Sequence, residues 1–117
     1  MVAARRARSV YLPVAEIAPA LAHYRDGLGL TEAWREEEQT VALELPGSEV
    51  KLMLDATDPA SSPGPLFVVD SVATFREAHP SLDYAADLEI PGGRLTSFTD
   101  PWSNVVYVMD QSTAEAP

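Results

Sequence analysis

The side chains that most often carry out chemistry in enzymes are scarce in this sequence. There is no cysteine, which excludes a thiolate nucleophile and a thiolate metal site, and there are only two histidines. His23 falls inside a predicted helix and His79 directly precedes the helix-ending Pro80, so both are expected at the surface or at helix ends. Asp100 fits a turn position and Asp70 a helix cap. No acid–base pair stands out, and we predict no catalytic residue.

The aromatic side chains offer a different kind of chemistry, and one of them lies in the stretch FTDPWSNVVYVMD (residues 98–110). Asp100 and Pro101 favour a type I turn that places Trp102 near its tip. Ser103 then occupies a position that usually has a left-handed backbone, at a cost of roughly 1 kcal/mol for a non-glycine residue. The strand that follows carries no charge until Asp110, so both of its faces are expected to be apolar.

The composition indicates one soluble domain with a real core, because 46% of the 117 residues are hydrophobic. The net charge of −10 argues against nucleic-acid binding and permits the attraction of a cationic ligand. No apolar run approaches the roughly 18 residues of a membrane span, and the basic start MVAARRARSV lacks the apolar stretch of a secretory signal. We therefore expect a cytoplasmic protein, and the preference for Arg over Lys hints at a GC-rich bacterial source.

The predicted elements follow the order strand, helix, three strands, and this order occurs twice. In the first half the helix presents Ile17, Leu21, Tyr24 and Leu28 on one face, and the strands are Ser9–Val14, Thr31–Arg35, Thr40–Leu45 and Val50–Asp55. In the second half a helix through Val72 and Phe75 begins at Asp70 or Ser71, and the strands are Leu66–Val69, Asp83–Glu89, Arg94–Thr99 and Asn104–Met109. We predict an α+β fold with mostly antiparallel sheets and outer helices. The single domain (1–117) would contain module one (about 8–55), a loop (56–64) and module two (about 65–110).

Four stretches in this order resemble the vicinal oxygen chelate superfamily, which includes glyoxalases, extradiol dioxygenases and bleomycin resistance proteins. They are HYRDGLGL (23–30), VALELPG (41–47), LFVVDSV (66–72) and FTDPWSNVVYV (98–108). The resemblance implies two βαβββ modules with a cleft between their sheets. Enzymes of the superfamily hold a divalent metal there with His, Gln or Glu.

The resemblance also identifies the four positions of the metal ligands, and in this sequence none carries a ligand. They fall at Ser9, Met53, Gly64 and Tyr107. These side chains do not form a site for a hard or borderline divalent cation. We therefore predict no metal and no cofactor, as in the bleomycin-resistance branch.

The alternation of side chains along strands then predicts which residues line the cleft. They are Ser9, Tyr11, Lys51, Met53, Asp55, Leu66, Val68, Val105, Tyr107 and Met109. Trp102 is expected at the rim, and Trp34 is a candidate whose facing the pattern does not determine. Aromatic and Met side chains around a metal-free cleft favour stacking on a planar ligand.

These features predict a homodimer that sequesters a natural product such as an antibiotic without altering it, and so confers resistance. Bleomycin, mitomycin and enediyne or other polycyclic ligands are all compatible. One alternative is an enzyme of the same fold, either metal-free or using unusual ligands such as Glu44 and Asp55, with lyase, isomerase or ring-modifying activity. Another is a ligand-responsive or accessory interaction protein.

Overall fold

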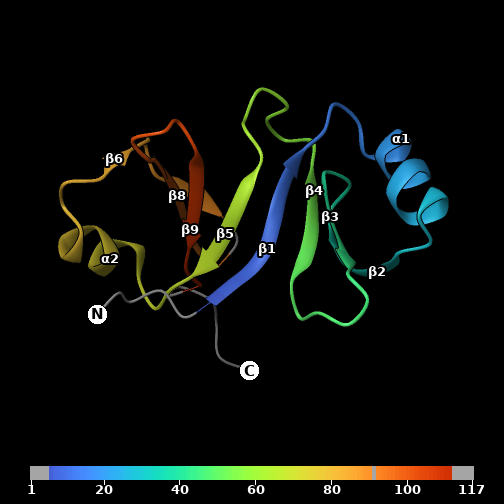
Figure 1. The fold of residues 1–117 in the computed structure, drawn as a ribbon, viewed down its shortest axis with the longest axis horizontal. Coiled ribbons are helices and arrows are strands. Elements are labelled where there is room, and N and C mark those ends of the chain that lie inside the picture. Colours follow the sequence, from blue (N-terminus) through green and yellow to red (C-terminus); the bar gives the residue numbers. More distant parts are fainter. Residues whose placement is uncertain (1–5, 91, 112–117) are drawn as a thin grey trace. The chain divides into compact units, whose positions relative to one another are not determined.

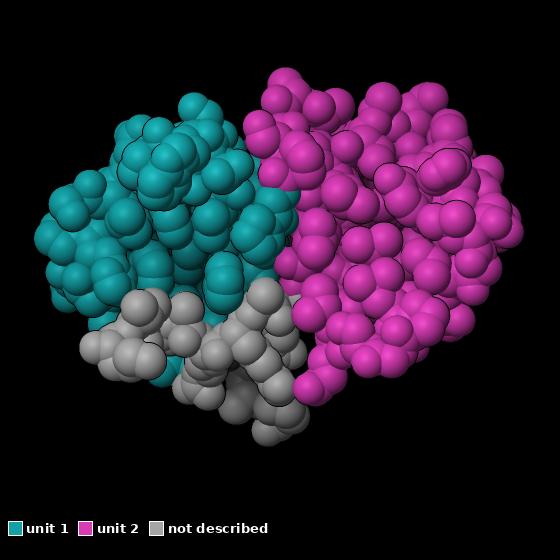
Figure 2. Space-filling view, in the orientation of Figure 1, with its two compact units in different colours: residues 1–7, 64–117 teal, residues 8–63 magenta. Residues whose placement is uncertain are grey.

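The structure is a computed structural model that describes residues 6–90 and 92–111. The chain divides into two compact units (Figure 2). Unit 2 comprises residues 8–63, and unit 1 comprises residues 1–7 and 64–117. Both contain strands and a helix, so the predicted α+β class is confirmed. No helix in the described ranges combines the length and the apolar character needed to cross a membrane.

Unit 2 contains a four-stranded sheet with a helical segment on one face (Figure 1). Its elements are residues 8–13 of β1 (Arg6–Pro13), α1 (Ile17–Leu21), the π-helical η1 (Ala22–Gly27), β2 (Thr31–Glu36), β3 (Thr40–Glu44) and β4 (Lys51–Asp55). The strand order is β2-β3-β4-β1, in which β1 runs parallel to β4 and the other neighbours are antiparallel.

The core of unit 2 follows from the alternation of side chains along these strands. Val41, Leu43 and Leu54 point to one face and are fully buried against Ile17 and Leu21 of α1. Residues at alternate positions on the same strands must point to the opposite face. The helix therefore covers one face of the sheet and leaves the other for the predicted lining residues.

The predicted helix face is wrong at its last member, Leu28. The helical segment widens into η1, where the Leu28 N–H donates to the carbonyl of His23, five residues back. This spacing moves Leu28 off the apolar stripe, and its side chain is 61% exposed. Gly29 follows with a φ of 76°, and Leu30 packs on the core in its place.

Unit 1 repeats the arrangement, with a helix packed against its own strands (Figure 1). Its elements are β5 (Gly64–Val68), α2 (Val72–Ala78), β6 (Asp83–Tyr84), β7 (Leu88–Ile90), β8 (Gly93–Thr99) and β9 (Val105–Met109). β9 lies between β5 and β8, parallel to β5 and antiparallel to β8. Ser71, not Asp70, is the N-cap of α2, because its hydroxyl accepts the N–H of Thr74 at 3.2 Å.

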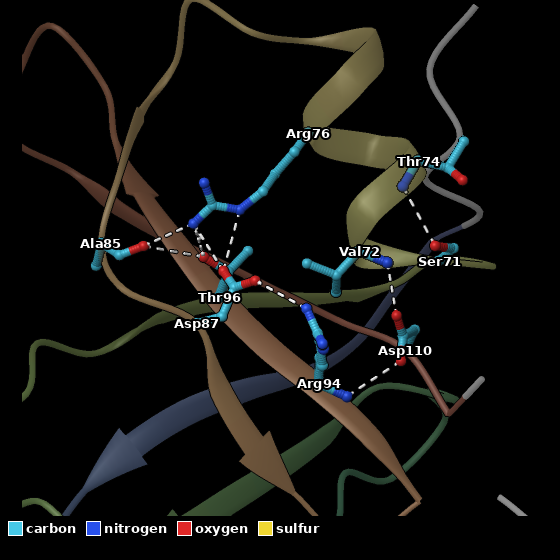
Figure 3. A network of polar contacts seen from close by, with 9 residues as sticks. All are labelled: Ser71, Val72, Thr74, Arg76, Ala85, Asp87, Arg94, Thr96 and Asp110. Carbon is cyan, nitrogen blue, oxygen red and sulfur yellow. Dashed lines mark hydrogen bonds and ion pairs between the residues drawn. The ribbon is translucent and has the colours of Figure 1, made fainter. Parts of the chain in front are cut away.

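The single strand predicted over Asp83–Glu89 is wrong, because β6 and β7 are separate strands that both pair with β8. The guanidinium of Arg76 lies at the break (Figure 3), where it donates to the Ala85 carbonyl at 2.8 Å and to the Asp87 carboxylate at 2.7 Å. Arg76 also lies 4.3 Å from the ring centre of Tyr84. Burial raises the pKa of the Tyr84 phenol, and the Arg76 charge partly opposes that shift.

Candidate functional site

In unit 2 the strand register brings the predicted lining residues together on the face opposite α1. Tyr11 pairs with Met53, Met53 with Ala42, and Ala42 with Trp34, so one row crosses all four strands. Ser9 lies in the next row on one side, opposite Lys51. Trp34, whose facing the sequence left open, is on this face and is 40% exposed.

The row on the other side of Tyr11 and Met53 contains Asp55 of β4, which pairs with Thr40 of the neighbouring strand β3. The Asp55 carboxylate accepts three hydrogen bonds. The Tyr11 phenol donates to Oδ2 at 2.6 Å, while the Thr40 hydroxyl and the Thr57 N–H donate to Oδ1 at 3.0 and 3.2 Å. These contacts fix the orientation of the carboxylate on the sheet.

In unit 1 a second set of predicted residues shares the sheet face opposite α2. Leu66 pairs with Tyr107 and Val68 with Met109 between β5 and β9, and Val105 lies two residues before Tyr107. Val108, at the alternate position, packs on Val72 and Phe75, as the strand alternation predicts. The structure thus gathers the predicted residues of each unit on one sheet face of that unit.

Trp102 lies outside the strands of unit 1, on the turn between β8 and β9, and is 78% exposed. The turn is closed by the Ser103 N–H on the Asp100 carbonyl, and the φ of Ser103 is 70°, as its position predicts. The Asp100 carboxylate accepts the backbone N–H groups of Trp102 and Asn104, both at 2.9 Å. The tip that presents the indole ring is therefore well fixed.

These contacts make the turn sensitive to acid. Hydrogen bonds from Asn104, and a further one from Trp102, hold the pKa of Asp100 below its ordinary value of 3.8. Because the folded pKa is depressed, the stabilisation by the charged form is complete above 3.8 and is lost as the pH falls through the lower folded value. We expect the backbone amide signals of Trp102 and Asn104 to shift together, with a midpoint below pH 3.8. An NMR titration in which they moved at or above 3.8 would contradict this, and Asp100→Asn should abolish the shift.

The two histidines do not build a site. The His23 ring meets the Tyr24 ring edge-on at 4.8 Å, and His79 is the C-cap of α2 with its ring 4.8 Å from that of Phe75. Within residues 6–90 and 92–111, no three His, Asp or Glu side chains converge as metal ligands would.

The sequence did not single out a hollow of about 590 Å³ in unit 2. It is lined by Gly29, Leu30, Thr31 and residues 44–49. The motif Pro46-Gly47-Ser48 predicted the turn on one wall but not the concavity, because the other wall is formed by residues 29–31, which follow η1. No aromatic ring lines this hollow, so it is not the predicted stacking surface.

No protein-family model matches the sequence, and no curated protein matches it. Solved structures do match. Methylmalonyl-CoA epimerase from Mycobacterium tuberculosis is 18% identical, with a TM-score of 0.64, and the match covers 99% of this chain and 91% of that chain. A glyoxalase/bleomycin resistance protein/dioxygenase superfamily member from Vibrio splendidus is 18% identical over 87% of this chain and 95% of that one, with a TM-score of 0.55. The chain has the vicinal oxygen chelate fold.

The vicinal oxygen chelate fold does not by itself decide between binding and catalysis. A third solved structure, an NAD-dependent benzaldehyde dehydrogenase from Legionella pneumophila, is 16% identical over 87% of this chain and 96% of that one, with a TM-score of 0.68. Proteins with different names thus share this fold at identities that establish the fold alone.

The metal that the vicinal oxygen chelate fold suggests does not fit this chain. Of the four ligand positions, Ser9 and Met53 lie on the unit 2 face and Tyr107 on the unit 1 face. At Gly64 a side chain is excluded by space, because its Cβ atom would overlap the carbonyl oxygen of Val105. A coordinating residue could not stand there unless the backbone of β5 or β9 moved.

We therefore expect the purified protein to carry no stoichiometric zinc, nickel, manganese or iron. Elemental analysis after dialysis against metal-free buffer checks this directly. A value near one metal ion per chain would contradict the prediction, and loosely bound metal would be removed by a weak chelator.

Asp110 is a residue whose role the sequence did not reveal. It is 2% exposed, and its carboxylate accepts the Val72 N–H at 2.6 Å and the Arg94 N–H at 3.1 Å (Figure 3). It thereby joins the end of β9 to the start of α2 and to β8. Its signal in the sequence is the single charge that ends an apolar strand, but its partners are 38 and 16 residues away.

Proposed function

We propose that the protein binds a planar aromatic small molecule, such as an antibiotic, and holds it without chemical change in the cytoplasm of a bacterium. The observation that supports this most is the gathering of the predicted lining residues on the helix-free sheet face of each unit. Those faces combine aromatic, Met and aliphatic side chains with a few polar groups, which is typical of small-molecule sites. Trp34 is exposed on the unit 2 face, whereas Ser9, Tyr11, Leu66 and Tyr107 are buried.

Binding without catalysis is favoured because the described residues that correspond to metal ligands do not fit a metal. Ser9, Met53 and Tyr107 are poor ligands for a divalent cation, and Gly64 has no space for a side chain. Sequestration needs only affinity and enough protein. Resistance would follow from the removal of free drug.

The test is a screen of planar natural products, including polycyclic antibiotics, followed through tryptophan fluorescence. The bound compound is then recovered by denaturing the protein and compared with the starting compound by mass spectrometry. Recovery of the unchanged compound after prolonged incubation supports sequestration. A product that accumulates with time would instead support an enzyme, and a screen without any bound compound would contradict the proposal.

We also propose that the functional form is a homodimer with two symmetric pockets. Closed two-fold dimers are the commonest homo-oligomers of soluble proteins. We expect light scattering at micromolar concentration to give twice the mass of the chain. The mass of a single chain under these conditions would contradict the dimer.

A further inference from the structure

Asp55 is the one acidic side chain of the unit 2 face whose carboxylate is held by three hydrogen bonds within the described residues. A carboxylate offers about four acceptor positions. Thr40 and Thr57 use two on Oδ1, and Tyr11 uses one on Oδ2, so the carboxylate keeps acceptor capacity on Oδ2. The 5% exposure of Tyr11 shows that the strongest of these donors is itself fixed by packing.

The three donors of Asp55 are neutral groups, namely a phenol, a hydroxyl and a backbone amide. The ion pairs recorded for the described residues join Arg25 and Arg35 to acidic side chains in unit 2, and none of them includes Asp55. Neutral donors orient a carboxylate but do not cancel its charge. Asp55 can therefore attract a cation brought to this face, and the attraction grows where the ligand excludes water.

The surroundings of Asp55 indicate what kind of cation would fit. The adjacent row contains Met53 on the same strand and Trp34 two strands away, separated by the small side chain of Ala42. Rows of side chains on one face are about 7 Å apart along a strand. A fused aromatic ring on the Trp34 and Met53 row would thus place a substituent nitrogen within reach of Asp55.

We propose that Asp55 selects planar ligands that carry a positively charged nitrogen. Tyr11 and Thr40 act as positioning residues that aim its carboxylate. This proposal rests on the proposed binding function and adds the chemical class of the ligand. The protonated nitrogen would donate to Oδ2, and the ring would stack along the Trp34 row.

The experiment compares 9-aminoacridine, which is protonated at neutral pH, with acridine, which is neutral there and has the same ring system. With the wild-type protein at low salt, we expect 9-aminoacridine to bind about 10- to 100-fold more tightly, the range expected for a charge-assisted hydrogen bond. The difference should shrink at high salt. Asp55→Asn should lower the affinity for 9-aminoacridine to within about twofold of that for acridine and leave acridine binding unchanged.

The matched control is Asp58→Asn, which removes the same charge from the same unit. The Asp58 carboxylate is held within its own loop by Ser61 and Ala60. Asp58→Asn should therefore change the affinity for 9-aminoacridine and the affinity for acridine by no more than about twofold each. An equal loss in both variants would assign the preference to net charge and overturn the role of Asp55.

The two proposals can fail separately. Equal binding of both probes by the wild-type protein would overturn the selection by charge while leaving aromatic binding intact. This comparison requires only the wild-type protein. Failure of both probes to bind would overturn the charge selection together with the stacking surface on which it rests. Circular dichroism of each variant distinguishes a lost contact from a lost fold.

Discussion

Replacement of Trp102 by alanine is expected to weaken the binding of a planar aromatic ligand by about 5- to 150-fold, the range that corresponds to a stacking contact of roughly 1–3 kcal/mol. The indole is 78% exposed, so little of the fold's stability depends on its packing. The Trp102 N–H that donates to Asp100 belongs to the backbone and is retained in the variant. The loss should therefore appear in the affinity and not in the melting temperature.

Titration calorimetry with acridine measures this effect, and Leu28→Ala is the matched control. Leu28 is also strongly exposed, but it follows η1 and is not among the predicted lining residues. We expect Leu28→Ala to leave the affinity unchanged within experimental error. If Trp102→Ala bound acridine as tightly as the wild type with its fold intact, Trp102 would have no part in binding.

Most elements of the fold could be predicted because their signals are local. The alternation in VVYVM, the cap at Ser71 and the left-handed position at Ser103 each depend on residues within a few positions of one another. For the same reason the grouping of Val105, Tyr107 and Met109 on one face followed from the strand alone. The resemblance to the superfamily added the expectation of two modules with the same order of elements. It did not identify a ligand.

The features that sequence reasoning missed depend on contacts between distant positions or on irregular backbone. Trp34 could not be assigned a face because the β2–β3 register shifts between Glu32 and Trp34, and a bulge breaks the simple alternation. The break between β6 and β7 coincides with Arg76 of α2, nine residues before its acceptor Ala85. The exposure of Leu28 results from the wider turn of η1, which the spacing of apolar residues does not reveal.

The candidate site shows the same division. Tyr11, Met53 and Asp55 were predicted to share a face from strand parity, and the register places them side by side. Two of the three hydrogen bonds that orient Asp55 join it to residues 44 and 15 positions away, so no local pattern could indicate these two. A side chain's facing can thus be read from a strand, whereas its orientation and charge environment require the folded sheet.

Asp110→Ala is expected to be more destabilising than any other substitution named above, at roughly 3–6 kcal/mol, because a hydrogen bond to a charged group contributes about 1.5–3 kcal/mol and two are lost. The carboxylate accepts the Val72 N–H at the start of α2 and the Arg94 N–H on β8, and both donors would lose this acceptor (Figure 3). Gly93 packs closely on this residue, because a Cβ atom at Gly93 would overlap the backbone carbonyl and the carboxylate of Asp110. Urea denaturation measures the effect, with replacement of the exposed Asp83 of β6 by alanine as a control expected within about 0.5 kcal/mol of wild type. A loss below about 1 kcal/mol for Asp110→Ala would show that α2 is held to the sheet by the packing of Val72, Phe75 and Val108 alone.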